Sequence, residues 1–254
     1  MYNNKKMPKY PKPFPIVIKI FWAGIFQRKL SFHATAQYCI KRLYPPLKVL
    51  GQENIPKGGP LLLLTNHYTH PGFPSWWITL SSSSVVPAEI HWITAAAWTS
   101  PDPLYTRIIT PITFWAFTRL AWIFGFTPMP PMPPRPSDIT ARTLAVRKVL
   151  AYVRNTKNPL VGLAPEGQDE FADGLIMPPN GVGRFIYHLA NAGLDFLPIG
   201  VFEQDDRLCV HFGSPYHLDL PGKLSLDEKD IWISKKVMSS IAPLLPYELR
   251  GLFR

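Results

Sequence analysis

Residues 61–72 read LLLLTNHYTHPG, and this stretch decides the fold. Its four leucines, Leu61–Leu64, form the continuous apolar run that is typical of a strand buried on both faces of a parallel sheet. Asn66 and His67 follow where that strand is predicted to end. Because ligands of open α/β sheets bind beyond the carboxyl ends of the strands, the stretch also predicts a binding or catalytic site there.

A second stretch, PLVGLAPEG at residues 159–167, repeats this arrangement further along the chain. Leu160–Leu163 is again an apolar strand candidate, and Pro165, Glu166 and Gly167 come directly after it. We expect Glu166 to lie opposite His67 at the same edge of the sheet, since parallel strands end together.

Strand and helix signals alternate along most of the chain, which predicts an α/β fold. The expected architecture is a mixed, largely parallel β-sheet flanked by helices, with amphipathic helices at the N-terminus. The proline-rich residues 127–136 are expected to form an extended loop, and Ser137 or Asp138 to cap the helix that follows. We expect helices near residues 16–43 (one or two), 73–83, 104–126, 139–155, 181–192 and 225–242, and strands near 47–50, 61–64, 90–97, 160–163, 197–202 and 208–212.

The net charge of +10 is concentrated at the N-terminus. Residues 1–50 contain ten Lys or Arg and no acidic residue, whereas the rest of the chain carries 17 of each sign. A basic segment beside an apolar one is attracted to anionic lipids, by about 1 kcal/mol per basic residue near the surface. A nucleic-acid-binding arm is the alternative, and it is disfavoured because no basic and aromatic platform follows, so no nucleic-acid partner is expected.

Two segments are candidates for lipid contact. The apolar run 16–26 contains Lys19 and is shorter than the roughly 20 residues that a membrane span requires. We expect a helix lying in the membrane interface, with packing against the protein's own core as the alternative. No cleavage site follows the run, so no signal peptide is expected. Residues 104–126, interrupted by Pro111, form the second candidate, as a surface or groove element rather than a span.

His67 is the residue with the clearest chemical potential. A neutral imidazole is the side chain best suited to accept a proton near neutral pH, although a structural histidine is an equal alternative on this feature alone. The spacing of His67 and His70 suits a metal, but no third ligand lies nearby, so no metal is expected. Cys39 and Cys209 have no paired partners in the sequence and are expected to be reduced core residues.

Taken in order, the motifs resemble those of the PlsC-like glycerolipid acyltransferases. That family shows a Gly-x-Glu-Asn-x-Pro lead-in, an Asn-His-x4-Asp block, a Phe-Pro-Glu-Gly-Thr-Arg block and a Val-Pro-Val-type strand. The corresponding stretches here are Gly51–Pro56, Asn66–His67, Pro165–Gly167, Leu197–Gly200 and the following Phe212–Pro215.

The resemblance implies an acyltransferase of phospholipid or glycerolipid synthesis. It implies that His67 acts as general base on an acceptor hydroxyl, which attacks the thioester of an acyl-CoA or acyl-carrier protein; no other cofactor is implied. Asn66, Pro165, Glu166 and Gly167 would bind the acceptor. Residues 1–44 would be a basic helical segment at the membrane interface, and residues 45–254 an acyltransferase-like α/β domain. The expected location is the cytoplasmic face of a membrane, with peripheral or monotopic attachment to anionic lipids.

The chain departs from the family pattern in three places. Gly72 stands where the family has the aspartate that orients the histidine, and Gln168-Asp169 replaces Thr-Arg. The region of the family's middle block is a Pro/Met loop with only Arg135 beside it. Glu166 and Asp169 are the candidates to supply the absent carboxylate. Without arginines for a phosphate, we expect an acceptor other than simple glycerol 3-phosphate. A lipid-binding protein with weakened catalysis and a thioesterase are the rival interpretations.

Overall fold

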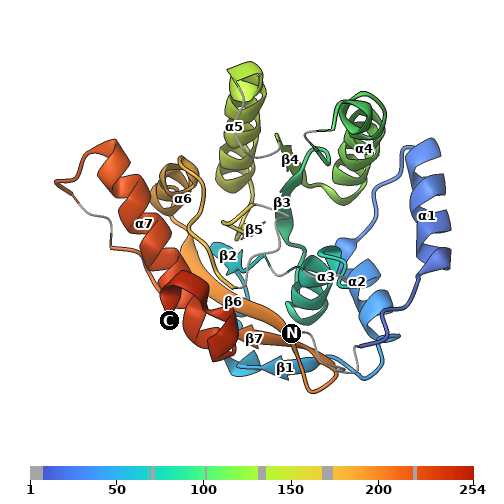
Figure 1. Ribbon diagram of the computed structural model, residues 1–254, viewed down its shortest axis with the longest axis horizontal. Coiled ribbons are helices and arrows are strands. Elements are labelled where there is room, and N and C mark those ends of the chain that lie inside the picture. Colours follow the sequence, from blue (N-terminus) through green and yellow to red (C-terminus); the bar gives the residue numbers. More distant parts are fainter. Residues whose placement is uncertain are drawn as a thin grey trace.

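A seven-stranded sheet with helices on both faces forms the centre of the molecule, as the computed structural model shows (Figure 1). The structure describes residues 8–67, 69, 72–100, 102–130, 136–167, 174–219 and 222–254. The strands are β1 (Lys48–Leu50), β2 (Leu61–Thr65), β3 (His91–Ala95), β4 (Thr127–Met129), β5 (Leu160–Leu163), β6 (Asp195–Gln204) and β7 (Arg207–Phe212). The helices are α1 (Phe14–Ile25), α2 (Phe32–Ile40), α3 (Trp76–Val85), α4 (Pro103–Phe124), α5 (Ile139–Asn155), α6 (Val182–Asn191) and α7 (Leu226–Ile241). This confirms the predicted α/β class.

The sheet is mostly parallel, with strand order β1-β7-β6-β2-β5-β3-β4. Every neighbouring pair runs parallel except β6 and β7, which form an antiparallel hairpin. The hairpin turns at Asp205 and Asp206, whose positive φ angles of 51° and 59° suit a tight two-residue turn. Strand β2 lies between β6 and β5, and its carboxyl end adjoins the carboxyl end of β5 and the middle of β6, where Thr65 is in register with Ile199.

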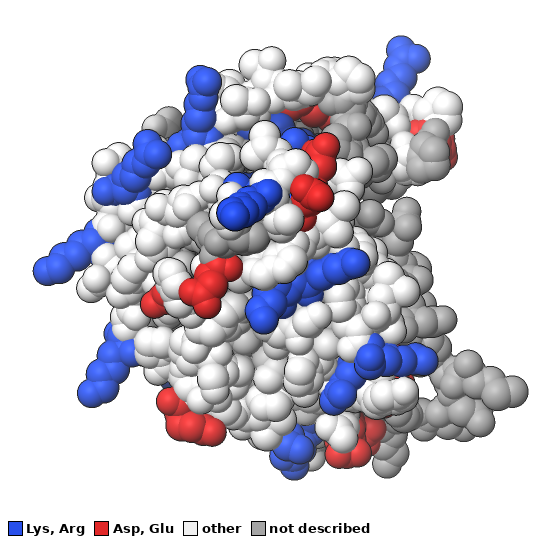
Figure 2. All heavy atoms as spheres, turned by 90° about the vertical axis from the view of Figure 1, so that its left-hand side faces the viewer, with Lys and Arg blue, Asp and Glu red and all other residues white. Residues whose placement is uncertain are grey.

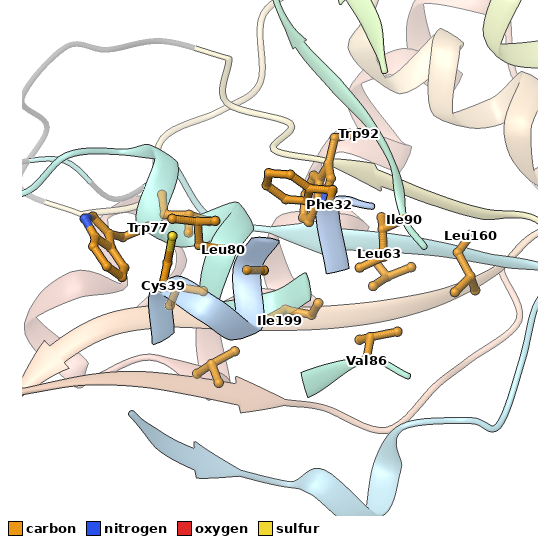
Figure 3. Close-up of a cluster of buried hydrophobic side chains, with 14 of the residues drawn as sticks. Phe32, Cys39, Leu63, Trp77, Leu80, Val86, Ile90, Trp92, Leu160 and Ile199 are labelled. Atoms are coloured by element: carbon orange, nitrogen blue, oxygen red, sulfur yellow. The ribbon is translucent and has the colours of Figure 1, made fainter. Parts of the chain in front are cut away.

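The two faces of the sheet bury separate hydrophobic clusters, because alternate leucines of β2 point to opposite sides. Leu61 and Leu63 pack with α2 and α3 on one face; Figure 3 shows this cluster around Leu63 and Trp77. Leu62 and Leu64 pack with α5, α6 and α7 on the other face. Both free cysteines, Cys39 and Cys209, are buried in these clusters, as predicted.

The two N-terminal helices have different surroundings. α2 contributes Phe32, Ala36 and Cys39 to the core beneath the sheet. α1 buries little, and large apolar side chains along it are exposed: Phe14, Val17, Ile18, Phe21, Trp22 and Ile25. α1 packs against α4, where Arg119 donates a hydrogen bond to the carbonyl of Gly24. The helical prediction for this segment is thereby confirmed, while its boundary at residue 44 and its contact with lipid stay predictions.

The loop predicted at 127–136 is partly wrong, because its first three residues form strand β4. β4 pairs with β3 in parallel and lies at the edge of the sheet. Pro128 is tolerated there because an edge strand needs hydrogen bonds on one side only. The predicted cap of α5 is also not formed by a side chain: Asp138 is the residue at that position, but no side-chain capping hydrogen bond is made.

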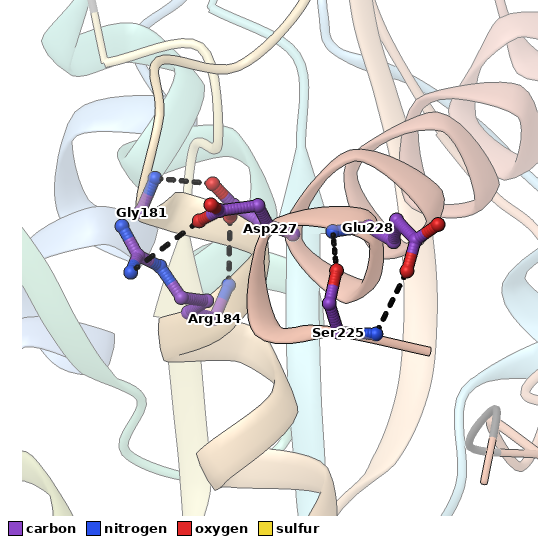
Figure 4. Close-up of polar contacts among 6 residues, drawn as sticks. Gly181, Arg184, Ser225, Asp227 and Glu228 are labelled. Atoms are coloured by element: carbon purple, nitrogen blue, oxygen red, sulfur yellow. Dashed lines mark hydrogen bonds and ion pairs between the residues drawn. The ribbon is translucent and has the colours of Figure 1, made fainter. Parts of the chain in front are cut away.

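Carboxylate side chains accept backbone N–H groups at the starts of two helices, α7 and α6. Ser225 and Glu228 form a reciprocal capping box at the start of α7 (Figure 4). Asp230 of α7 is buried and accepts the backbone N–H groups of Gly181 (2.6 Å) and Arg184 (2.8 Å) at the start of α6. Asp230 therefore links α7 to the amino end of α6, which comes after the Glu166 segment in the sequence.

Figure 2 shows the side of the molecule on which α7 lies, where basic and acidic side chains are interspersed. Within the described part of the chain, no helix combines the length and apolar character that crossing a bilayer demands.

Candidate active site

The two polar stretches singled out in the sequence meet at one edge of the sheet. β2 and β5 are adjacent and parallel, with Leu64 in register with Leu163. The residues that follow each strand are brought together as a result. The backbone N–H of His67 donates a 2.6 Å hydrogen bond to Oε2 of Glu166. The predicted juxtaposition of these two residues is present.

Glu166 joins two segments of backbone. Its Oε1 accepts the N–H of Ile176 at 3.0 Å, while Oε2 accepts the N–H of His67. The side chain is buried, with only 4% of the residue exposed. The carboxylate therefore ties the turn after β2 to the segment that leads into α6. It reaches the backbone of His67, which differs from the suggestion that it would take the place of the absent aspartate.

Burial also sets the ionisation of this carboxylate. Loss of solvation raises the pKa of Glu166 from 4.5 to about 7, although the two backbone hydrogen bonds act in the opposite direction. Glu166 thus changes charge near neutral pH, which is unusual for a glutamate. A perturbed carboxyl group beside a histidine at the end of a sheet is typical of a functional site.

Asn66 fixes the other side of the same turn. Its Nδ2 donates to the carbonyl of Val201 at 2.8 Å, and its Oδ1 accepts the N–H of Val201 at 2.7 Å. Asn66 is 3% exposed. These bonds hold the end of β2 against β6, so the observed contacts of Asn66 are positional. Direct binding of substrate by Asn66 stays a prediction.

His67 itself is half-buried and has its Nδ1 atom enclosed by the protein. Gly72, which stands at the position of the family's aspartate, has a φ of +95°, and a Cβ built there would meet no heavy atom within 4 Å. The space for a side chain exists, but the backbone conformation favours glycine.

The remaining predicted site residues lie beside Glu166. Pro165 is buried, and Gly167 is exposed with a φ of +60°. Their predicted roles in acceptor binding stay predictions. Gln168, Asp169, Arg135 and His70 lie outside the described residues. Among described residues, no group of three or more His, Cys, Asp or Glu side chains is arranged to hold a metal ion.

The lead-in and final motifs have structural roles. Asn54 donates a 3.0 Å hydrogen bond from Nδ2 to the carbonyl of Phe212. At Gly51, whose φ is +65°, a Cβ would lie 2.0 Å from that same oxygen. The two motifs therefore pack together where β1 meets β7, and they support the sheet rather than the chemistry.

An open groove of about 390 Å³ lies beside the site. It is lined by residues of the turn after β2 and of the start of α3, together with Trp98, which follows β3. The structure places Trp76 in the groove and Trp77 in the core. No spacing signal in the sequence connects Trp98 to this turn.

Known proteins were compared with the chain. No family sequence profile matches it, and no curated protein sequence is significantly similar to it. Among solved structures, the 1-acyl-sn-glycerophosphate (LPA) acyltransferase PlsC from Thermotoga maritima superposes with a TM-score of 0.53 at 12% sequence identity. The match covers 84% of this chain and 78% of that chain. The molecule thus has the PlsC-like acyltransferase fold.

Proposed function

We propose that this protein is a membrane-associated acyltransferase that moves a fatty acyl group from a thioester donor to the hydroxyl group of a lipid-type acceptor. The observation that carries the proposal is the turn after β2, which presents His67 and is fastened by Asn66 to β6 and by Glu166 to the segment before α6. A fastened histidine at the carboxyl edge of a parallel sheet suits general base catalysis. The fold shared with PlsC supports the same reaction class.

His67 would supply the proton transfers. With Nδ1 enclosed, Nε2 is the candidate base atom. It takes the proton of the acceptor hydroxyl as the oxygen attacks the thioester carbonyl. The tetrahedral adduct then collapses, the carbon–sulfur bond breaks, and the thiolate leaves with the proton from the imidazolium. The products are an ester and a free thiol, and no acyl-enzyme forms. The donor is an acyl-CoA or an acyl-carrier protein.

The exposed apolar side chains of α1 and α4 support attachment to a membrane. Between residues 14 and 25 the sole charged side chain is Lys19, and α4 carries Arg107 and Arg119 but no acidic residue. Apolar faces with flanking basic groups bind the interface of anionic bilayers. We propose peripheral attachment through this side, with the active site acting at the cytoplasmic membrane surface.

The acceptor is proposed to lack a phosphate of the glycerol 3-phosphate type. The family's phosphate-binding arginine is replaced by Asp169, which would repel that group. A non-catalytic lipid-binding protein is the second candidate, and it is favoured by Gly72, whose open position holds no carboxylate. A thioesterase would use water in place of the alcohol.

One experiment separates these functions. Purified protein is incubated with acyl-CoA donors of several chain lengths, and release of free thiol is followed with and without glycerolipid acceptors, for wild type and His67→Ala. Acceptor-dependent release that is lost in His67→Ala supports acyl transfer. Release that does not depend on acceptor identifies a thioesterase. Retained liposome binding without any His67-dependent release identifies the lipid-binding function and overturns the proposal.

A further inference from the structure

The C-terminal segment, residues 247–253, lies against the part of the chain that follows the candidate site. It consists of two short 3-10 helices. Both backbone polar groups of Leu175 are bonded to it. The Leu175 N–H donates to the carbonyl of Leu249 at 3.0 Å, and the Leu175 carbonyl accepts the N–H of Leu252 at 3.1 Å. The C-terminal segment therefore sets the position of the Leu175 backbone.

Two glycines allow the two backbones to approach this closely. Gly174 and Gly251 have φ angles of +123° and +51°, which residues with a side chain rarely adopt. A Cβ at Gly251 would lie 2.1 Å from the carbonyl oxygen of Leu175, and a Cβ at Gly174 would lie 2.6 Å from the backbone nitrogen of Gly251. Because the atoms in the way belong to the backbone, a side chain at either position would push the two segments apart.

The C-terminal segment is itself attached to the core of the molecule. Leu249 and Phe253 pack against the hydrophobic cluster of α5, α6 and α7, in which Leu175 is also buried. Nε of Arg250 donates a 3.0 Å hydrogen bond to the carbonyl of Leu245, a buried residue shortly after α7. The segment is thus fixed in place by the core and by the residues that follow α7.

Ile176 connects this support to the candidate site, because it directly follows Leu175. The Ile176 N–H donates to Oε1 of Glu166 at 3.0 Å, and Oε2 of Glu166 accepts the N–H of His67 at 2.6 Å. Glu166 is 4% exposed, so these two backbone groups, rather than solvent, fix its carboxylate. A series of backbone contacts therefore leads from the C-terminal segment through Glu166 to the turn that carries His67.

We propose that the C-terminal segment is a positioning element of the active site, which acts on His67 through Glu166. Gly174 and Gly251 are the positioning residues. The inference rests on the proposed function, which gives His67 its role as base. If the segment moves away, Glu166 loses one of the two N–H groups that fix its carboxylate, and the hold on the His67 turn weakens. A catalytic group displaced by about 1 Å can slow a reaction about a hundredfold.

Gly251→Ala in the whole chain tests the proposal, with Gly193→Ala as the matched control. Gly193 also has a positive φ, +90°, but a Cβ there would meet no heavy atom within 4 Å. The control therefore adds backbone strain of the same kind without displacing the segment. Amide hydrogen exchange measured by NMR reports on the contacts without any substrate, and His67-dependent thiol release reports on catalysis. Gly174→Ala, which disturbs the same contact from the other side, is the second variant if Gly251→Ala folds poorly.

We expect the amides of His67 and Ile176 to exchange at least about tenfold faster in Gly251→Ala than in wild type or Gly193→Ala. The amide of Leu61, which donates a 2.9 Å hydrogen bond at the other end of β2, is the reference and should change much less. The kcat of thiol release should fall at least about tenfold while KM changes little, because the base is displaced and not the substrate.

Three results would each overturn the proposal. They are wild-type exchange rates at His67 and Ile176 in Gly251→Ala, an equal acceleration at these amides and at Leu61, and an unchanged kcat in an active protein. An equal acceleration would show that the segment merely stabilises the fold. The expected exchange pattern in a protein that shows no His67-dependent thiol release would support the positioning of the turn and refute only the proposed reaction.

Discussion

Replacing Glu166 by Gln should remove a specific pH dependence from the stability of the fold. In the folded protein the pKa of Glu166 is raised from 4.5 to about 7 by burial. Between these two pH values the folded protein holds a proton that the unfolded chain has already lost. The raised pKa therefore adds stability that is fully present below pH 4.5 and is lost as the pH rises to about 7.

The size of the effect follows from the two pKa values. Each pKa unit corresponds to about 1.4 kcal/mol, so the interval from 4.5 to about 7 corresponds to a change of about 3 kcal/mol in the free energy of unfolding. Glutamine does not titrate, so Glu166→Gln lacks this pH-dependent contribution to the free energy of unfolding. Its amide oxygen accepts one of the two backbone N–H groups, of His67 or Ile176, and its NH₂ group faces the other.

Urea unfolding followed by tryptophan fluorescence between pH 4 and pH 8 measures the difference. The free energy of unfolding of wild type relative to Glu166→Gln should fall by about 3 kcal/mol across that range. Glu53→Gln, which changes an exposed carboxylate, is the matched control and should follow the wild-type profile. Parallel profiles for wild type and Glu166→Gln would refute the buried, proton-binding role of this residue.

Three further substitutions test other contacts. Asn66→Ala removes both hydrogen bonds to Val201, so it should lower the free energy of unfolding by about 1–3 kcal/mol and reduce the rate of thiol release. An unchanged rate would contradict the claim that Asn66 positions the turn that carries His67. Asp230→Ala leaves the backbone N–H groups at the start of α6 without their acceptor, and calorimetry should show that the free energy of unfolding falls by about 1 kcal/mol or more. Wild-type stability in this variant would contradict a stabilising role for Asp230. Gly162→Ala places a Cβ 2.3 Å from the Trp92 ring and should cost about 1–3 kcal/mol in urea unfolding, while a neutral effect would show that the ring moves aside.

Much of the fold was predictable because the hydrophobic pattern and the proline and glycine signals agree. The leucine run of β2 and the polar turn after it fixed the central strand and the edge that carries the candidate site. The failure at β4 has a definite cause: Pro128 indicates a loop in isolation, but an edge strand needs no hydrogen bond from its outer side.

The candidate site was predicted only in part. His67 and Glu166 were placed together because each follows an apolar strand, but the atoms that join them were not foreseen. The partners of Asn66 and Glu166 are backbone groups of Val201 and Ile176, and any residue type supplies such groups. The groove depends on Trp98, which is held beside the site by a hydrogen bond to Thr113 of α4. Neither Trp98 nor α4 is close to His67 in the sequence. Contacts of this kind arise from tertiary packing and leave no periodic signal.

The most direct test of the central claim is the rate of acyl transfer in His67→Ala compared with a matched histidine variant. His217 is an exposed residue that pairs with Asp195, beside the amino end of β2 and at the opposite end of that strand from the His67 turn, and it provides the control as His217→Ala. With a labelled acyl-CoA and a lipid acceptor, His67→Ala should slow formation of the labelled ester by about a hundredfold or more, while His217→Ala stays close to wild type. Ester formation at the wild-type rate in His67→Ala would contradict the assignment of His67 as the base.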